Sequence, residues 1–458
     1  MKKVLFIALA AILALSIGLV GCGEGEGEGE VPTAIKVGLV RDLDGILAFY
    51  DQFAGGPVYR AFNKTVNVGG GIFMSGYNDT LPVEVVVRDY DPLNPGDLGT
   101  QTIALITTNK VHFIWGGPGT TTIYTQAAIC NTYGILLETL EGGATDMMSD
   151  PAKLAVWPYT FINLSFSDWY EIPVLYKALK AQGISAPKAY VLYINNEHGN
   201  EYLQVTQSIF GAGNVTAEGH DQYVANQQDI EDIVTHAKTA LGNVSSPNYD
   251  IFCAYTYDPF LGYVMTAFNA TGFNPPAIIM GPGANTGAYW MWYQANMEGI
   301  CVFAVANNKT VISEPTTMSM QTMFNLVMAE IGVPAPGFFA WDPWGDPTLF
   351  AGLEMWKEAV ETVGHLGTGY TDEVRDVLVG FNQTNPCKTV IGDCWYKIFG
   401  GGSGGGVMDY QAMPGQIGQW QNDYVEIIGY PTVTSDIPKY SATANMTYPM
   451  TDQWYWLP

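Results

Sequence analysis

The chain has 458 residues, of which 48% are hydrophobic, which is enough to fill the cores of two globular lobes. It carries 44 Asp and Glu against 19 Lys and Arg, a net charge of −25. A surface this negative excludes nucleic acid and anionic lipid as partners bound through it.

The N-terminus predicts export and lipid anchoring. Two lysines precede an apolar run from 4 to 20, and small residues lead into Cys22. This order is typical of a lipoprotein signal peptide, so we expect residues 1–21 to be removed, Cys22 to be lipidated and the protein to lie outside the cytoplasm, in the periplasm or on the outer face of the cell membrane. Residues 22–32 are rich in Gly and Glu and cannot bury apolar area, which favours a flexible tether over an uncleaved membrane anchor.

Two series of alternating strands and helices follow the tether. In the first series we expect strands at 35–40, 83–88, 111–115 and 134–138, and helices at 48–67, 97–108 and 122–132. In the second we expect strands at 189–194, 249–254 and 277–280, and helices at 169–182, 200–210, 228–241 and 262–269. This alternation predicts two α/β lobes with parallel sheets wrapped by helices.

The two lobes are expected to exchange chain segments. The expected extents are 33–157 with about 283–412 for lobe 1, and 158–282 with about 413–458 for lobe 2. A helix at 348–363 and a structured segment at 417–429 show that the last part of the chain also folds. The glycine-rich run at 400–406 is a linker by composition, although apolar segments on both sides allow a hairpin turn equally well.

The six cysteines predict one disulfide and no metal site. With Cys22 committed to lipid, Cys387 and Cys394 lie in a turn-rich stretch and can close a small surface disulfide in an oxidising compartment. The other three occur in apolar contexts that indicate buried thiols: Cys130, Cys253 and Cys301. None of the five histidines has a second His or Cys at metal spacing, so neither zinc nor any other cofactor is expected.

The loop at 116–122 is the first candidate binding element. Open α/β sheets bind ligands beyond the carboxyl ends of their strands, where loops meet helix N-termini. Thr120 and Thr121 offer hydroxyls beside free N–H groups at a helix start, which suits a carboxylate or another polar oxygen, although a plain helix cap is the alternative. Phe49 and Tyr50, after the first strand, can form an apolar wall for a ligand.

Six segments match a known family in order and spacing. They are IKVGLVRDLDGILAFYDQ at 35–52, RDYDPLNPGDLGTQTIALI at 88–106, GGPGTTTIYTQA at 116–127, GILLETLEGGAT at 134–145, YDPFLGYVMTAFNATGF at 257–273 and IGQWQNDYVEIIGYP at 417–431. Together they resemble the leucine/isoleucine/valine-binding branch of type I periplasmic binding proteins, which serve ABC transporters. The resemblance implies two Rossmann-like lobes joined by three crossing strands, a small-molecule ligand held between them, and an ABC permease as partner; we expect a monomer.

The resemblance also implies ligand contacts, position by position. It places Thr120, Gly143 and Thr145 around the acidic head of the ligand. From the other lobe it places Tyr257 and His198 as aromatic contacts. A tyrosine is usual where this chain has His198, so a surface histidine is the alternative there, and a purely structural tyrosine is the alternative for Tyr257.

One departure from the family pattern concerns the ligand's amino group. Amino-acid binders of this family carry an acidic residue after a Gly-Pro pair, and this chain has Gly283 there. Glu141 or Asp258 can replace it, because each lies in an expected loop of the cleft, but each is also explained as a solvated carboxylate. The expected ligand is therefore a small polar molecule with an apolar body: an amino acid, a carboxylate or an amide.

Two other function classes use similar folds. The enzyme class lacks support: the only G-x-S-x-G match lies inside the glycine run, at 401–405, and there is no phosphate-binding loop, so no catalytic residue is assigned. A ligand-sensing subunit of a membrane receptor shares the same fold. Permease and ATPase genes beside that of the protein would favour transport. We expect a solute-binding lipoprotein of an ABC importer, in the class that includes amino acid transport.

Overall fold

The computed structural model describes a long central part of the chain and a short C-terminal stretch. Described are residues 31–428 apart from 46, 95, 118, 140–155, 165–166, 222–225, 244–245, 258–259, 288, 290–292, 333–340, 410 and 423, together with 442 and 444–446. The chain divides into two units, Met1–Thr33 and Ala34–Pro458, and all elements below belong to the second. No helix in these ranges combines the length and the apolar character that a bilayer crossing requires. The expected signal peptide and Cys22 lie outside the described residues.

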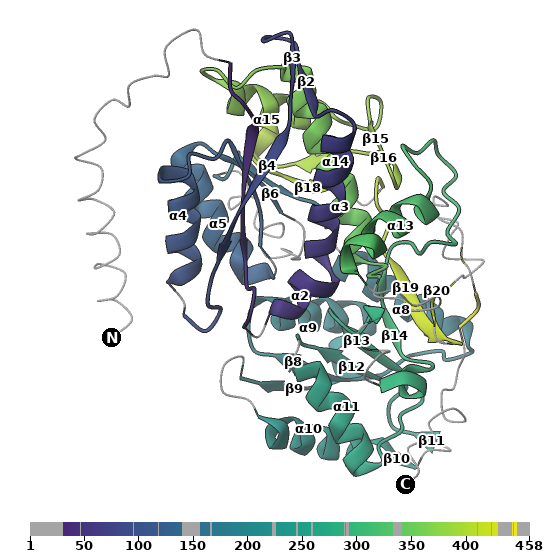
Figure 1. The fold of residues 1–458 in the computed structure, drawn as a ribbon. Helices are drawn as coiled ribbons and strands as arrows, with labels where there is room; N and C mark the ends of the chain where they lie inside the picture. The colour runs from purple at the N-terminus through teal and green to yellow at the C-terminus, as the bar shows by residue number, and fades with distance from the viewer. Residues whose placement is uncertain are drawn as a thin grey trace. The chain divides into compact units, whose positions relative to one another are not determined.

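The first sheet has seven strands in the order β17-β18-β7-β6-β5-β1-β4. Figure 1 labels β4, β6 and β18 of this sheet. Their bounds are β1 (Ile35–Arg41), β4 (Val83–Asp89), β5 (Phe113–Trp115), β6 (Leu136–Thr139), β7 (Thr160–Ile162), β17 (Tyr396–Ile398) and β18 (Gly406–Met408). All neighbours pair in parallel except β17 and β18, which are antiparallel. The parallel strands therefore end at one common edge of the sheet.

Helices cover both faces of this sheet because its strands are apolar on both faces. On β1, Val37 and Leu39 belong to one core with α3 (Gly55–Val68) and α14 (Gly345–Val363), whereas Val40 belongs to another with α4 (Asp97–Thr107) and α5 (Thr120–Tyr133). The single helix expected at 48–67 is in fact two, α2 (Ala48–Phe53) and α3. The break depends on Gly56, since a Cβ there would lie 2.0 Å from the backbone oxygen of Asp51.

The second sheet also has seven strands, in the order β20-β19-β14-β13-β12-β8-β9. Their bounds are β8 (Ala189–Ile194), β9 (Val215–His220), β12 (Ile251–Tyr255), β13 (Ile278–Gly281), β14 (Cys301–Ala304), β19 (Gln416–Gln421) and β20 (Tyr424–Ile427). The strands from β9 to β14 are parallel, and β19 and β20 extend the sheet as an antiparallel hairpin. Its helices pack in pairs, α8 (Ser167–Ala181) with α9 (Glu197–Phe210) and α10 (Gln227–Leu241) with α11 (Phe260–Thr271). The expected fold class, two Rossmann-like α/β lobes with largely parallel sheets, is confirmed.

Smaller elements complete the described part of the chain. They are β2 (Ile72–Met74), β3 (Asp79–Leu81), β10 (Gly242–Asn243), β11 (Ser246–Pro247), α13 (Met320–Ile331), α15 (Tyr370–Gly380), β15 (Cys387–Thr389), β16 (Gly392–Cys394) and the 3₁₀ turns at Ala212–Asn214, Gln294–Met297 and Gly400–Gly402. The glycine-rich run at 400–406 connects the antiparallel strands β17 and β18, so it is a hairpin turn and not a domain linker.

Two strands pair in a different sheet from the one that the expected lobe boundaries assign to them. Thr160–Ile162 pairs within the first sheet, beyond the expected boundary at 157. Cys301–Ala304 pairs within the second sheet, beyond the expected return at 282. Both segments are short, fully buried apolar strands. Such strands suit either sheet by composition, and only the neighbour with which they hydrogen-bond decides to which they belong.

All five described cysteines are buried, so Cys387 and Cys394 do not lie on the surface as the sequence suggested, and these two lie opposite each other. In the two-stranded β15–β16 sheet, Cys387 is the direct partner of Cys394, and both are free thiols. Cys130, Cys253 and Cys301 are also buried and free. Burial raises the pKa of Cys253 and of Cys301 to about 12, so these thiols are not poised for reaction.

We predict that Cys387 and Cys394 form a disulfide in the exported protein. Directly opposed residues of an antiparallel pair have Cα atoms about 4.5 to 5.5 Å apart, within the range that a disulfide bridges. Mass spectrometry of peptides prepared without reductant should recover these two residues cross-linked and Cys130 as a thiol. Replacing both with serine should lower the free energy of unfolding by about 2 kcal/mol. Recovery of both as free thiols after export would contradict the prediction.

Candidate functional site

The loop between β5 and α5 is stabilised by hydrogen bonds between its backbone and side chains of α5, and it ends at Thr120. The N–H of Gly117 donates to Oε1 of Gln126 at 2.9 Å. Gly119 has a φ of 89°, a conformation that favours glycine. The hydroxyl of Thr122 donates to the carbonyl of Gly119 at 2.6 Å, so this threonine stabilises the loop. Thr120 begins the 14-residue helix α5 and is fully buried.

Tyr257, from the other lobe, faces this loop. It follows β12, at the carboxyl end of the second sheet's strands. A Cβ on Gly119 would lie 3.9 Å from its hydroxyl oxygen. Burial raises the pKa of Tyr257, and hydrogen bonding by the backbone of Thr120 opposes that rise. The side-chain oxygen of Thr120 has no hydrogen-bond partner among the described residues. Two residues expected from the sequence, one from each lobe, therefore meet.

His198 adds a second aromatic ring to this contact. It is the second residue of α9 and stacks on Tyr257 with ring centroids 4.6 Å apart. Only 3% of its surface is exposed, which decides against a surface histidine. Burial lowers its pKa to about 3, although a backbone hydrogen bond with Gly281 opposes this, so the ring is neutral at neutral pH. Its Nε2 atom has no hydrogen-bond partner among the described residues.

The short helix α2 contacts the second lobe beside His198. The hydroxyl of Tyr50 donates to the carbonyl of Pro282 at 3.3 Å, in the segment that follows β13. The ring of Phe49 meets that of Tyr289 edge to face, with centroids 6.0 Å apart. Because His198 bonds to Gly281, the adjacent pair 281–282 lies next to both His198 and Tyr50. Four expected site residues, Tyr50, Thr120, His198 and Tyr257, thus lie in one region between the lobes.

Part of the expected site lies outside the described residues. This part comprises Gly143 and Thr145, and the two carboxylates that the sequence offers for a ligand ammonium, Glu141 and Asp258. Thr121 lies in the first turn of α5. Gly283 donates its N–H to Oδ1 of Asn285 at 2.8 Å.

A buried ion pair that the sequence did not single out lies beside the loop. Arg41 ends β1, is fully buried, and places its Nε 3.1 Å from Oδ1 of Asp51 in α2. Its guanidinium lies 5.7 Å from the ring centre of Tyr59, whose hydroxyl donates to the carbonyl of Gly116 at 2.9 Å. The only sequence signal was an arginine directly after an apolar strand. The pair connects the end of β1 to α2 and to the start of the 116–122 loop.

A buried carboxyl group connects the ends of β6 and β7 to β17. Glu138 accepts a hydrogen bond from Nδ2 of Asn163 at 2.8 Å and one from the hydroxyl of Tyr396 at 3.2 Å. Burial raises the pKa of Glu138 to about 8, although these two hydrogen bonds oppose the rise. The group is therefore largely protonated at neutral pH, and it adds no full negative charge to this edge of the sheet.

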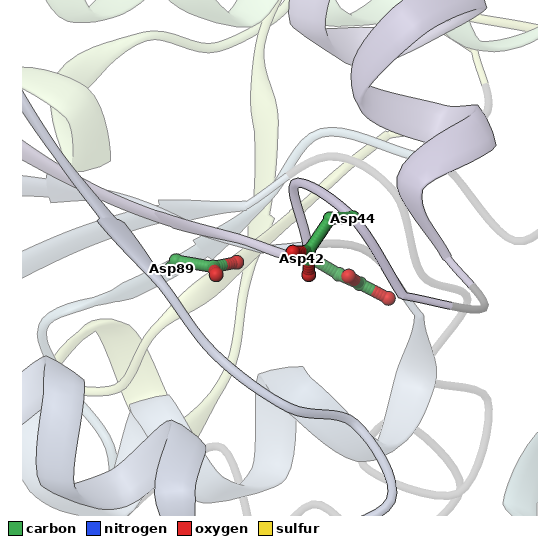
Figure 2. Close-up of side chains that lie close together, drawn as sticks. All are labelled: Asp42, Asp44 and Asp89. Carbon is green, nitrogen blue, oxygen red and sulfur yellow. The ribbon is translucent and has the colours of Figure 1, made fainter.

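Three carboxylates gather where β1 and β4 end (Figure 2). The oxygens of Asp42, Asp44 and Asp89 lie within 4.8 Å of one another. Carboxylate oxygens of this kind suit a hard cation. However, Asp42 accepts N–H groups from Gly45 at 2.6 Å and Leu47 at 2.7 Å, so it stabilises the turn that leads into α2. We read the group as part of that turn.

Comparison with known proteins identifies the fold. A family model described as periplasmic binding protein matches residues 34–393, and no curated protein sequence matches the chain. The branched-chain amino acid transporter substrate-binding protein LivJ from Streptococcus pneumoniae, in complex with isoleucine, superposes with a TM-score of 0.65 at 16% identity, over 86% of this chain and 99% of its own. The leucine-binding protein LivK from Thermotoga maritima gives 0.64 at 13%, over 86% and 98%. A Rhodopseudomonas palustris solute-binding protein in complex with benzoate gives 0.64 at 15%, over 86% and 96%.

The neutral, buried ring of His198 predicts a pH dependence of stability. Its folded pKa of about 3 lies below the unfolded value of 6.5, so its contribution is complete above pH 6.5 and is lost as the pH falls toward 3. Between about pH 7 and pH 5 the protein should lose about 2 kcal/mol of unfolding free energy that a His198→Phe variant keeps. Urea unfolding of both proteins at the two pH values measures the difference. The same pH dependence in both would contradict a buried neutral ring.

Proposed function

The chain belongs to the periplasmic binding protein family, and we propose that it is an extracytoplasmic solute-binding lipoprotein that captures a small polar molecule for an ABC importer. The observation that carries the proposal is the approach of Tyr257, on which His198 stacks, to the start of α5 at Thr120. These residues come from two lobes and follow the carboxyl ends of parallel strands, where open α/β sheets bind ligands. Two of the similar solved proteins are named as substrate-binding and leucine-binding proteins, which favours capture over catalysis.

The chemistry of the contact supports a ligand with a polar head and an apolar body. The start of α5 offers backbone N–H groups and the hydroxyl of Thr120, which suit a carboxylate or an amide oxygen. The neutral His198 leaves Nε2 to exchange a hydrogen bond with that head, and Phe49 and Tyr50 supply aromatic surface. Isoleucine and benzoate, bound by two of the similar proteins, share a carboxylate and an apolar body. Gly143 and Thr145 complete the head site in this proposal.

A ligand ammonium group has less support from the described residues than a carboxylate or an amide has. Gly283 has no side chain at the position where amino-acid binders carry a carboxylate, and its N–H already bonds to Asn285. The buried carboxyl group of Glu138 is held protonated by its surroundings. We therefore propose carboxylates and amides alongside amino acids as ligands.

We predict that Thr120 and Tyr257 contribute to affinity. A thermal-shift screen of amino acids, short carboxylates, aromatic acids and amides should identify a ligand, because binding to the folded state raises its stability. Removing the Thr120 hydroxyl in Thr120→Ala should then cost about 1 to 3 kcal/mol, roughly a five- to hundredfold loss in affinity by calorimetry. Tyr257→Ala should also weaken binding, and Tyr257→Phe separates the loss of the hydroxyl from the loss of the ring.

The matched control for these variants is Thr216→Ala. Thr216 is exposed and lies in the edge strand β9. Its hydroxyl should not matter for binding. If Thr120→Ala and Tyr257→Ala both bind the ligand as the parent does, the site lies elsewhere even though the fold is right.

We predict that the mature protein begins at Cys22 and is held on the membrane by lipid. The signal-like N-terminus and the Gly/Glu tether support this anchor, which would keep the protein near the ABC permease that we propose as its partner. Cys22→Ser should release the protein into the soluble fraction of the native host. Retention of the variant on membranes at the parental level would count against lipidation.

A further inference from the structure

The strand β4 forms one edge of the first sheet and pairs only with β1. The N–H of Ile35 donates to the carbonyl of Pro82 at 2.9 Å, and the N–H of Tyr90 donates to the carbonyl of Arg41 at 3.0 Å. Even-numbered residues therefore direct their backbone groups toward β1. Because backbone groups alternate along a strand, Val83, Val85 and Val87 direct theirs toward the open edge.

One of these three outward positions is already occupied. The side chain of Asn67, in α3, accepts from the N–H of Val83 at 2.8 Å and donates to its carbonyl at 3.0 Å. Within the described ranges, no hydrogen bond joins the outward backbone groups of Val85 and Val87. The side chain of Val87 is 46% exposed. Such an edge is a template for pairing with another strand.

We propose that β4 pairs antiparallel with β4 of a second copy of this chain. In the register centred on Val86, Val85 of each copy lies opposite Val87 of the other. Directly opposed residues of this kind exchange both N–H···O bonds, so the outward groups of Val85 and Val87 in both copies are satisfied. The two valine pairs lie on the same face of the joined sheet and bury apolar surface there.

Opposite charges on Glu84 and Arg88 favour the register centred on Val86. Glu84 and Arg88 each lie two residues from Val86. In this register the glutamate of each copy therefore lies opposite the arginine of the other, which gives two such pairs in the dimer. Glu84 is exposed, and Arg88 is held by Asn109 and Gln101 through its Nε and Nη1 atoms, at 2.9 and 3.0 Å. Nη2 of Arg88 is left for the glutamate of the second copy. Opposite charges directly across antiparallel strands stabilise the pairing.

The two neighbouring registers are worse. Centring the pair on Val85 requires the backbone groups of Val83, which Asn67 already occupies. Centring it on Val87 puts Glu84 opposite Tyr90 and leaves both charges without an opposite partner. Because the charges of β4 are complementary to themselves about Val86, the partner strand is that of a second copy of the same chain. The monomer expected from composition and resemblance took no account of this edge.

Charge reversal tests the pairing by sedimentation velocity, over a concentration series at physiological ionic strength. The parent should form a reversible dimer. Glu84→Arg and Arg88→Glu should each oppose like charges across the edge and raise the dissociation constant about tenfold or more. The double reversal should restore the dimer, and an equimolar mixture of the two single variants should form a heterodimer. Glu358→Arg, on the exposed side of α14, should dimerise as the parent does.

Amide hydrogen exchange locates the interface independently. The amides of Val85 and Val87 should exchange more slowly as the protein concentration rises, and those of the other sheet's edge strand, β9, should not change. Glu84→Arg should remain folded by circular dichroism, because Glu84 is exposed and forms no salt bridge within the described residues. A parent that stays monomeric at every concentration, a Glu84→Arg variant that dimerises as the parent does, or protection confined to another surface would each overturn the proposal.

Discussion

Contact between Tyr257, which follows β12, and the start of α5 at Gly119 and Thr120 joins the end of a strand in one lobe to the start of a helix in the other, and the candidate site is organised around it. Each partner is placed by its own sheet, because β5 and β12 are parallel strands whose carboxyl ends lead into short loops. His198 stacks on Tyr257, and the backbone next to its Gly281 partner accepts from Tyr50. Any ligand held between the lobes has to share or replace these contacts.

Three buried ionisable groups near this contact add little net charge, whereas burial and, with it, the negative charges of Glu201 and Glu197 raise the pKa of Tyr257. His198 is neutral and Glu138 largely protonated at neutral pH, because burial disfavours their charged forms. Arg41 keeps its charge, but it is paired with Asp51. On the side of α5, hydroxyls, backbone N–H groups and the helix start are left to bind the polar head of a ligand, which fits a carboxylate or an amide.

The two edges of the first sheet differ. The first sheet ends in β4, where Asn67 satisfies one outward position and leaves two open. At its other edge, β17 folds back on β18 as a hairpin. Edge strands tend to associate unless something covers them, so the side chains beside the open positions decide what can pair there. On β4 these are Glu84 and Arg88. They favour a partner strand with the opposite charges at the facing positions, as a second copy of β4 provides.

The sequence by itself determined the class of fold and much of the element order. The strand at Ala189–Ile194 has the bounds expected from its apolar run, and the loop at 116–122 leads into α5 at Thr120. These features are local: a buried strand and a helix start follow from a few consecutive residues. Sheet membership of Thr160–Ile162 and Cys301–Ala304, the burial of His198 and the Arg41–Asp51 pair were decided only by tertiary structure. The physical reason is the same for each: hydrogen bonds and desolvation depend on which distant segments lie alongside, and one strand or one histidine suits several neighbours until the chain has folded.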